Sequence, residues 1–172
     1  MKLKVTLDHN GFIPDQYAKF APDNYRYDGM PTVNFPVIIT DIPKNAQSLS
    51  VSLIDYDAVP VGGFPWIHWL AANLPVTNIP EHLKAHQLKN VIDGTNSTWH
   101  DVKMNQAPEN PEINQAYIGP MPPDKTHLYT LRVCALDTNL PLQNGFFLND
   151  LRTQSAAHIL ASATLELPAR SH

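Results

Sequence analysis

Hydrophobic and polar residues alternate along several short stretches of the chain, which is the pattern of β-strands with one buried face. From Ser48 to Leu53, serine occupies the even positions and leucine or valine the odd ones. Patterns of this length predict six strands. They are Leu3–Asp8, Val33–Thr40, Leu49–Tyr56, Ile67–Asn73, Leu128–Leu136 and Ala163–Leu167.

Helical periodicity is rare, and 16 prolines are spread along the chain, which favours short strands joined by rigid loops. Pro80–Lys89 is a weak helical candidate. Asn149–Ser162 is a better one, with Asn149 as its cap and Leu151, Ser155, His158 and Ile159 on one face. The stretch Asp93–Pro123 is rich in Asn, Pro and Gly, which predicts a long loop of the kind that often carries function.

Nothing divides the 172 residues: no linker and no repeat is visible, so we expect one mainly β domain spanning residues 1–172. A chain of this length buries roughly 70% of its unfolded surface and needs no covalent crosslink. The single cysteine, Cys134, lies in an apolar run, which predicts a buried and unreactive thiol.

The formal charge is −4, and no cluster of Lys or Arg is present. Nucleic-acid binding and attachment to a membrane through a polybasic patch both need such a cluster, so we expect neither. The segment Met1–Asp8 alternates instead of forming an apolar run. We therefore expect no signal peptide and no stable membrane insertion, and take a cytoplasmic location as the default.

Polar and aromatic residues continue the apolar face of three predicted strands, because residues two apart share a face of a strand. They are Asp55 and Asp57 after Leu53, Trp66 and His68 before Leu70 and Ala72, and His127 and Tyr129 before Leu131 and Val133. Together they predict one pocket with carboxylates and imidazoles in an apolar setting. A simpler interpretation is that the aspartates accept hydrogen bonds from amides in a turn and that each histidine is structural.

Other chemistries remain as alternatives. A serine hydrolase would need a nucleophile on a strained turn such as G-x-S-x-G, which the chain lacks. Two histidines and an aspartate have the composition of a 2-His-1-carboxylate metal site, but no local spacing identifies one, and we expect neither metal nor cofactor. An acid-base hydrolase using the Asp and His side chains is a further alternative.

At these residues the chain resembles the phosphatidylethanolamine-binding protein family, also called Raf kinase inhibitor-like proteins, and its prokaryotic branch in particular. The family carries a D-x-D-x-x-P segment, an H-W strand, a Y-x-G-P-x-P-P turn and an H-R-Y sequence. These are matched by Asp55–Pro60, Trp66–Trp69, Tyr117–Pro123 and His127–Tyr129. Leu128 replaces the usual arginine, Met121 stands where a smaller residue is common, and residues 96–116 lack the family's Asn-Asp-Gly pattern.

The resemblance implies an antiparallel β-sandwich of two sheets, with short peripheral and C-terminal helices and a pocket for phosphate or phosphorylethanolamine-like anions. Carried over to this chain, the ligand-binding residues are Asp55, Asp57, Trp66, His68, Gly119, Pro122, His127 and Tyr129. It also implies a possible homodimer.

The first hypothesis is a non-enzymatic binding or regulatory protein. In it His68 and His127 donate to anion oxygens, the Gly119 and Met121 amides are free for the ligand, and an aspartate orients an imidazole. Binding then weakens as pH rises through the histidine range. The alternative is a kinase or protease inhibitor or scaffold that docks through its surface.

Overall fold

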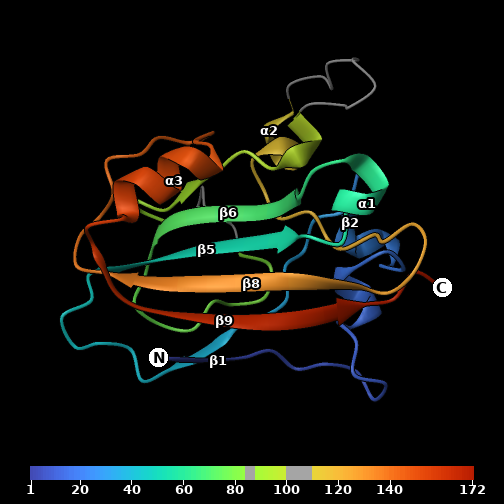
Figure 1. Cartoon of the computed structure of the whole chain (residues 1–172), viewed down its shortest axis with the longest axis horizontal. Helices are drawn as coiled ribbons and strands as arrows, with labels where there is room; N and C mark the ends of the chain where they lie inside the picture. The colour runs from blue at the N-terminus through green and yellow to red at the C-terminus, as the bar shows by residue number, and fades with distance from the viewer. Residues whose placement is uncertain (84–87, 100–109) are drawn as a thin grey trace.

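The computed structural model describes residues 1–83, 88–99 and 110–172, and it is mainly β (Figure 1). The strands are β1 (Lys2–Lys4), β2 (Arg26–Tyr27), β3 (Met30–Pro31), β4 (Ile38–Thr40), β5 (Ser48–Asp55), β6 (Trp66–Leu74), β7 (Ile92–Asp93), β8 (His127–Leu136) and β9 (Ile159–Ala169). The short helices are η1 (Asp15–Tyr17), η2 (Asp23–Tyr25), α1 (Val59–Gly62), η4 (Ser97–Trp99), α2 (Pro111–Asn114) and α3 (Leu148–Ser155).

The main layer is a five-stranded antiparallel sheet in the order β7-β6-β5-β8-β9. The β1–β4 pair and the extended chain around it form the second layer, and β1 runs beside β9 (Figure 1). Between the layers lies a core that contains Phe35 and Val37 from one side and Leu53 and Leu131 from the other. The predicted two-layer antiparallel architecture is confirmed.

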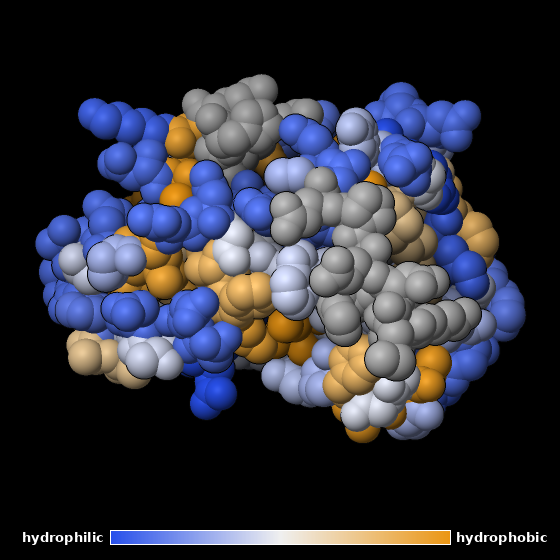
Figure 2. Space-filling view, turned by 90° about the horizontal axis from the view of Figure 1, so that it is seen from above, coloured by the Kyte–Doolittle hydropathy of each residue, from blue (hydrophilic) through white to orange (hydrophobic). Residues whose placement is uncertain are grey.

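A second, smaller core lies on the opposite face of the main sheet, under α3. Leu70 of β6 and Leu136 of β8 pack there with Leu151 of the helix. Strand β6 is therefore buried on both faces. Figure 2 shows the molecule from above, where apolar side chains reach the surface in separate patches between hydrophilic ones. No helix in the described part of the chain is both long and apolar enough to cross a bilayer.

The two N-terminal strands are shorter than predicted. Of the predicted stretch Leu3–Asp8, only Leu3 and Lys4 belong to a strand, β1. At its other end Asp8 forms a turn by accepting hydrogen bonds from the amides of Asn10 and Phe12. Within Val33–Thr40, strand pairing begins at Val37, which forms a bridge to Ile79. The residue before it is Pro36, which has no N–H to donate.

The predicted helix Asn149–Ser162 is right in its first half and wrong in its second. Helix α3 begins at Leu148, and the Asp150 carboxylate, not Asn149, accepts the hydrogen bond from the Phe147 amide at 2.9 Å. From Ile159 onward the chain is strand β9, paired with β8 along nearly its whole length. Pairing with a neighbouring strand therefore overrode the local helical pattern.

Two further predictions fall partly outside the described residues. Residues 84–87 of the weak helix Pro80–Lys89 lie outside the described part of the chain, and its described ends are not helical. Residues 100–109 of the predicted loop Asp93–Pro123 also lie outside it. The described parts of that stretch are loop with the short elements η4 and α2. Cys134 is buried as predicted, and burial raises the pKa of its thiol.

Candidate functional site

A cavity of about 250 Å³ opens at the end of the main sheet where β5 finishes and β8 begins. Its floor is polar and aromatic, whereas its walls are mostly apolar. The floor residues are Asp55, Trp66, His68, His127 and Tyr129, and the apolar wall residues include Met30, Val61, Phe64, Ile118, Met121 and Pro123. A site of this kind gives an apolar ligand body a place to pack and a few polar groups to orient its head.

A β-bulge brings His68 to this cavity. The pairing of β5 with β6 shifts between Leu53, opposite Trp69, and Ile54, opposite Ile67. One extra residue in β6 interrupts the period of two. Trp66 and His68 therefore face the cavity, while Leu70 packs under α3. The prediction that they share a face with Leu70 and Ala72 is wrong, although both residues do reach the pocket.

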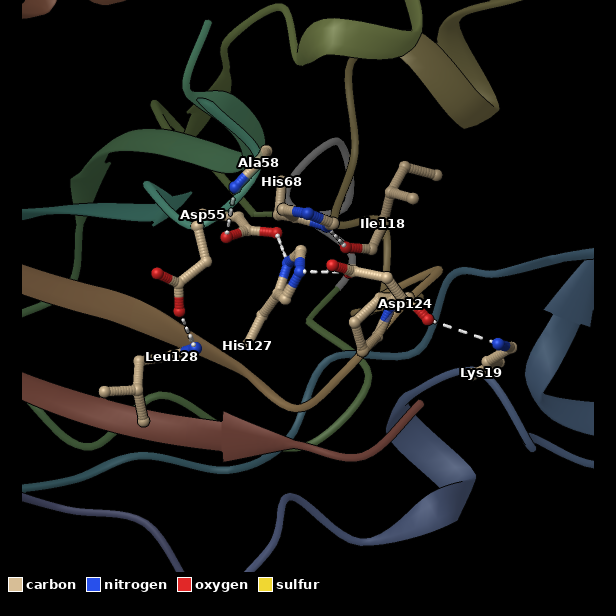
Figure 3. A network of polar contacts seen from close by, with 10 residues as sticks. Lys19, Asp55, Ala58, His68, Ile118, Asp124, His127 and Leu128 are labelled. Carbon is tan, nitrogen blue, oxygen red and sulfur yellow. Dashed lines mark hydrogen bonds and ion pairs between the residues drawn. The ribbon is translucent and has the colours of Figure 1, made fainter. Parts of the chain in front are cut away.

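The imidazole of His127 lies between two carboxylates (Figure 3). Its Nδ1 is 2.7 Å from Asp55 Oδ2, and its Nε2 is 2.8 Å from Asp124 Oδ1. Burial alone would lower the pKa of His127, but its hydrogen bonds to Asp55 and Asp124 outweigh this and raise the pKa. Two carboxylate acceptors on the two ring nitrogens favour the imidazolium form, in which both nitrogens donate.

The two carboxylates differ in their surroundings. Asp55 is buried, and its second oxygen accepts a hydrogen bond from the Ala58 amide at 3.1 Å, so it also holds the turn after β5. The side chain of Asp124 is 52% exposed and comes from the loop before β8. Asp55 is therefore fixed by the fold, while Asp124 stands at the edge of the solvent.

His68 is in the opposite ionisation state. Its Nδ1 donates to the Ile118 carbonyl at 2.8 Å, as Figure 3 shows, the Gly119 backbone is a second polar neighbour of the ring, and no described side chain hydrogen-bonds its Nε2. Burial lowers the pKa of His68 to about 4, so near neutral pH the ring is uncharged. Nε2 then carries a lone pair and accepts hydrogen bonds. The prediction that His68 donates to an anion requires the ring to gain a proton first.

Aromatic rings complete the floor. Tyr129 meets the His68 ring edge-on, with ring centroids 5.0 Å apart. Burial, followed by the nearby Asp55 charge, raises the pKa of Tyr129, so its hydroxyl keeps its proton. Trp66 stacks on Phe64 with ring centroids 6.0 Å apart. The Tyr129 phenol thus remains protonated as a hydroxyl, and the Trp66 indole adds an apolar surface to the floor.

Three of the predicted ligand-binding residues do not line the cavity. Asp57 accepts a hydrogen bond from the Leu128 amide, and the Pro122 carbonyl accepts one from Lys19. Gly119 donates its amide to the Pro31 carbonyl at 2.8 Å, so the prediction that this amide is free for a ligand is wrong. A Cβ at Gly119 would lie 2.3 Å from the Tyr17 carbonyl oxygen, which gives the glycine a packing role.

Sequence reasoning missed Asp124. Its spacing of three residues before His127 was the available signal, but only the folded loop places its carboxylate on the imidazole. Nothing in the sequence indicated that Met30 lines the cavity, because β3 is distant in sequence from the other lining residues. Across the described residues, no three His, Cys, Asp or Glu side chains gather as metal ligands would.

Comparison with known proteins places the chain in a family. Residues 4–169 match the family model described as phosphatidylethanolamine-binding protein. The chain belongs to the phosphatidylethanolamine-binding protein family. YxkA of Bacillus subtilis, an uncharacterised protein, is 42% identical over 170 residues, which cover 98% of this chain and 99% of that protein. A UPF0098 protein of Pyrococcus horikoshii is 31% identical over 169 residues, covering 93% and 72% of the two chains.

Solved structures of phosphatidylethanolamine-binding protein homologues share the fold. One, from Chlamydia trachomatis, superimposes with a TM-score of 0.74 at 24% identity, and the match covers 99% of this chain and 97% of that one. YbcL of Escherichia coli gives a TM-score of 0.73 at 18% identity, with 98% and 97% covered. The resemblance inferred from the four sequence motifs is thereby confirmed at the level of family and fold.

Proposed function

We propose that the protein is a non-enzymatic small-ligand-binding protein whose cavity takes a phosphate-type anionic group with a small or apolar body attached. The observation that carries this proposal is the pair of imidazoles at the cavity floor. His127 is held as a cation by two carboxylates, whereas His68 is held neutral and no described side chain hydrogen-bonds its Nε2. The apolar walls accommodate the rest of the ligand.

The neutral His68 sets the protonation of the complex. A dianionic phosphate group would place its oxygens against the Nε2 lone pair, which is repulsive. A monoanionic group instead donates its P–OH to Nε2, or the ring takes up a proton and donates to the dianion. In either form the complex contains one more proton than the neutral ring and the dianion contain together before they bind.

Anion affinity therefore falls as pH rises. The pKa of His68 is about 4 without ligand, and an anion bound at Nε2 raises it. Between the free and bound pKa values, binding takes up one proton, so the dissociation constant rises by up to about tenfold per pH unit. Anion affinity thus falls with rising pH, as we expected from the sequence, but in this proposal the group that changes protonation is His68 and not His127.

The same geometry argues against catalysis. A general acid or base works best with a pKa near the working pH, and the pKa of His68 is about 4. His127 has both nitrogens on carboxylates, so it has no lone pair with which to accept a proton. We infer that the floor recognises a charged head group and does not transform it.

Nuclear magnetic resonance titration tests this function. Inorganic phosphate and O-phosphorylethanolamine are added to the wild type, to His68→Gln, and to His158→Gln, whose histidine pairs with Asp137 away from the cavity. We expect saturable shifts of the His127 ring signals in the wild type and in His158→Gln, with much weaker binding in His68→Gln. Equal binding by all three proteins, or binding by none, would refute the proposal.

A further inference from the structure

A second cavity, of about 300 Å³, lies at the β7 edge of the main sheet and shares no lining residue with the first. Aromatic side chains form part of its wall, which is otherwise largely polar. Trp69 and Tyr117 are buried there, with their rings edge to face and centroids 5.7 Å apart, whereas Tyr27 is exposed near the surface. The cavity is large enough for a small organic molecule.

Asp93 contributes a carboxyl group that has no partner. Its backbone is fixed, since its amide donates to Asn144 Oδ1 at 3.0 Å and its carbonyl accepts from the Gly145 amide at 2.8 Å. Its carboxylate makes no hydrogen bond or ion pair with any residue that the structure describes. Burial raises the pKa of this carboxyl to about 7. A half-buried acid of this kind in a cavity needs a donor to become stable as an anion.

The other charged groups of the cavity do not supply that donor. The Arg26 guanidinium donates to the carbonyls of Ala21, Gly29 and Lys19, which use its Nε and both terminal nitrogens. Glu112 adds a second carboxylate at the exposed rim. The unsatisfied charge in this cavity is therefore negative.

We propose that this second cavity binds a small organic ammonium ion, with the ammonium group on the Asp93 carboxylate and an aromatic or apolar body against Trp69 and Tyr117. A charge-assisted N–H to carboxylate hydrogen bond is stronger than a neutral one. Aromatic faces also attract cations within about 6 Å of the ring centre. The site goes beyond the anion-binding function and does not depend on it.

The pH dependence of this site has the opposite sign to that of the anion cavity. A cation stabilises the Asp93 carboxylate, so binding releases a proton where the free carboxyl is protonated. The ionisable side chains around it are those of Arg26, His82 and Glu112 and the tyrosines, and the pH dependence that we expect comes from the Asp93 carboxyl, whose pKa is about 7. Protonation of the Asp93 carboxyl therefore weakens binding of the ammonium ion below pH 7.

The test compares benzylammonium with its neutral counterpart benzyl alcohol on the intact protein, following the Trp69 indole signal by nuclear magnetic resonance. At pH 8 we expect benzylammonium to bind about tenfold more tightly than the alcohol. Between pH 8 and pH 6 its affinity should fall about tenfold, because a carboxyl of pKa about 7 becomes mostly protonated. This wild-type series requires no substitution.

Three variants localise the effect. Asp93→Asn keeps the shape and should lose about tenfold in benzylammonium affinity at pH 8 while leaving benzyl alcohol within about twofold. Glu112→Gln removes a carboxylate at the rim of the same cavity and should change either affinity by less than about threefold. His82→Gln should leave most of the pH dependence in place. Equal affinity for amine and alcohol, or unchanged amine binding in Asp93→Asn, would overturn the proposal.

Discussion

Asp124 occupies the His127 nitrogen that an anionic ligand would use, and Asp124→Asn is expected to strengthen anion binding. The carboxylate accepts from Nε2 at 2.8 Å and is 52% exposed, so it competes with an anionic ligand for this nitrogen. An asparagine keeps an oxygen that can accept from Nε2 but carries no charge. Asp55 still holds Nδ1, so the imidazole keeps its orientation.

The magnitude follows from two effects. A hydrogen bond between charged groups contributes about 1.5–3 kcal/mol, and half exposure reduces this to about 1 kcal/mol. A displaced carboxylate that stays about 6 Å from the ligand charge repels it by about 1 kcal/mol in a largely aqueous setting. The two effects overlap, so the net gain is about 1–2 kcal/mol, or about tenfold in affinity.

Isothermal titration calorimetry with O-phosphorylethanolamine at pH 6 measures this gain. Asp137→Asn is the matched control, because Asp137 also pairs with a histidine, His158, at 2.8 Å and is similarly exposed. We expect the dissociation constant to fall about tenfold in Asp124→Asn and to change less than twofold in the control. An unchanged or weakened affinity in Asp124→Asn would show that the anion does not approach His127 Nε2.

Three further predictions concern stability, measured by urea unfolding. Asp55→Asn should lower the free energy of unfolding by about 3 kcal/mol at pH 7, because it breaks a buried ion pair, whereas Asp57→Asn should cost about 1 kcal/mol; equal losses would contradict this. Gly119→Ala should cost about 3 kcal/mol through its clash with a backbone carbonyl, and Gly62→Ala, which meets only ordinary contacts, less than about 1 kcal/mol. Asp93→Asn should raise the unfolding free energy by about 2 kcal/mol at pH 8, roughly half of what the full pKa shift implies because the side chain is partly exposed, and leave it unchanged near pH 3; the raised folded-state pKa of Asp93 makes its ionisation destabilising, and no difference at pH 8 would contradict this.

The central strands could be predicted from the sequence because their alternation is local and agrees with their burial. Along β5 and β8, Leu53 and Leu131 face the same core, and the continuation of that face places Asp55 and Tyr129 opposite each other. The alternation of side chains between the two faces of a strand is enough to place Asp55 and Tyr129 on the same face. Both positions were therefore recognisable before the structure.

The rest of the site depends on contacts between distant segments. The bulge in β6 changes which face His68 takes, and nothing in the residues around Trp66 marks the extra residue. The state of each imidazole was also not predictable, since it depends on the Ile118 carbonyl for His68 and on Asp124 for His127. A carbonyl from a later loop has no signature in the sequence.

The second cavity was outside the reach of sequence reasoning for the same reason. Asp93 lies in a polar stretch that predicts a loop, where an aspartate is ordinary. Its carboxyl becomes unusual only because β7 packs at the edge of the sheet and the surrounding segments bury it without offering a donor. Burial without a partner is a property of the folded chain.

The most direct test of the account is the proton uptake that accompanies anion binding. Calorimetric titration of wild-type protein with inorganic phosphate from pH 5.5 to pH 8.5, in two buffers of different ionisation enthalpy, measures it. With phosphate as a dianion above pH 7, we predict uptake of about one proton and a dissociation constant rising about tenfold per pH unit. An affinity that stays constant across this range, with no proton taken up, would contradict the role of neutral His68 in recognising the anion.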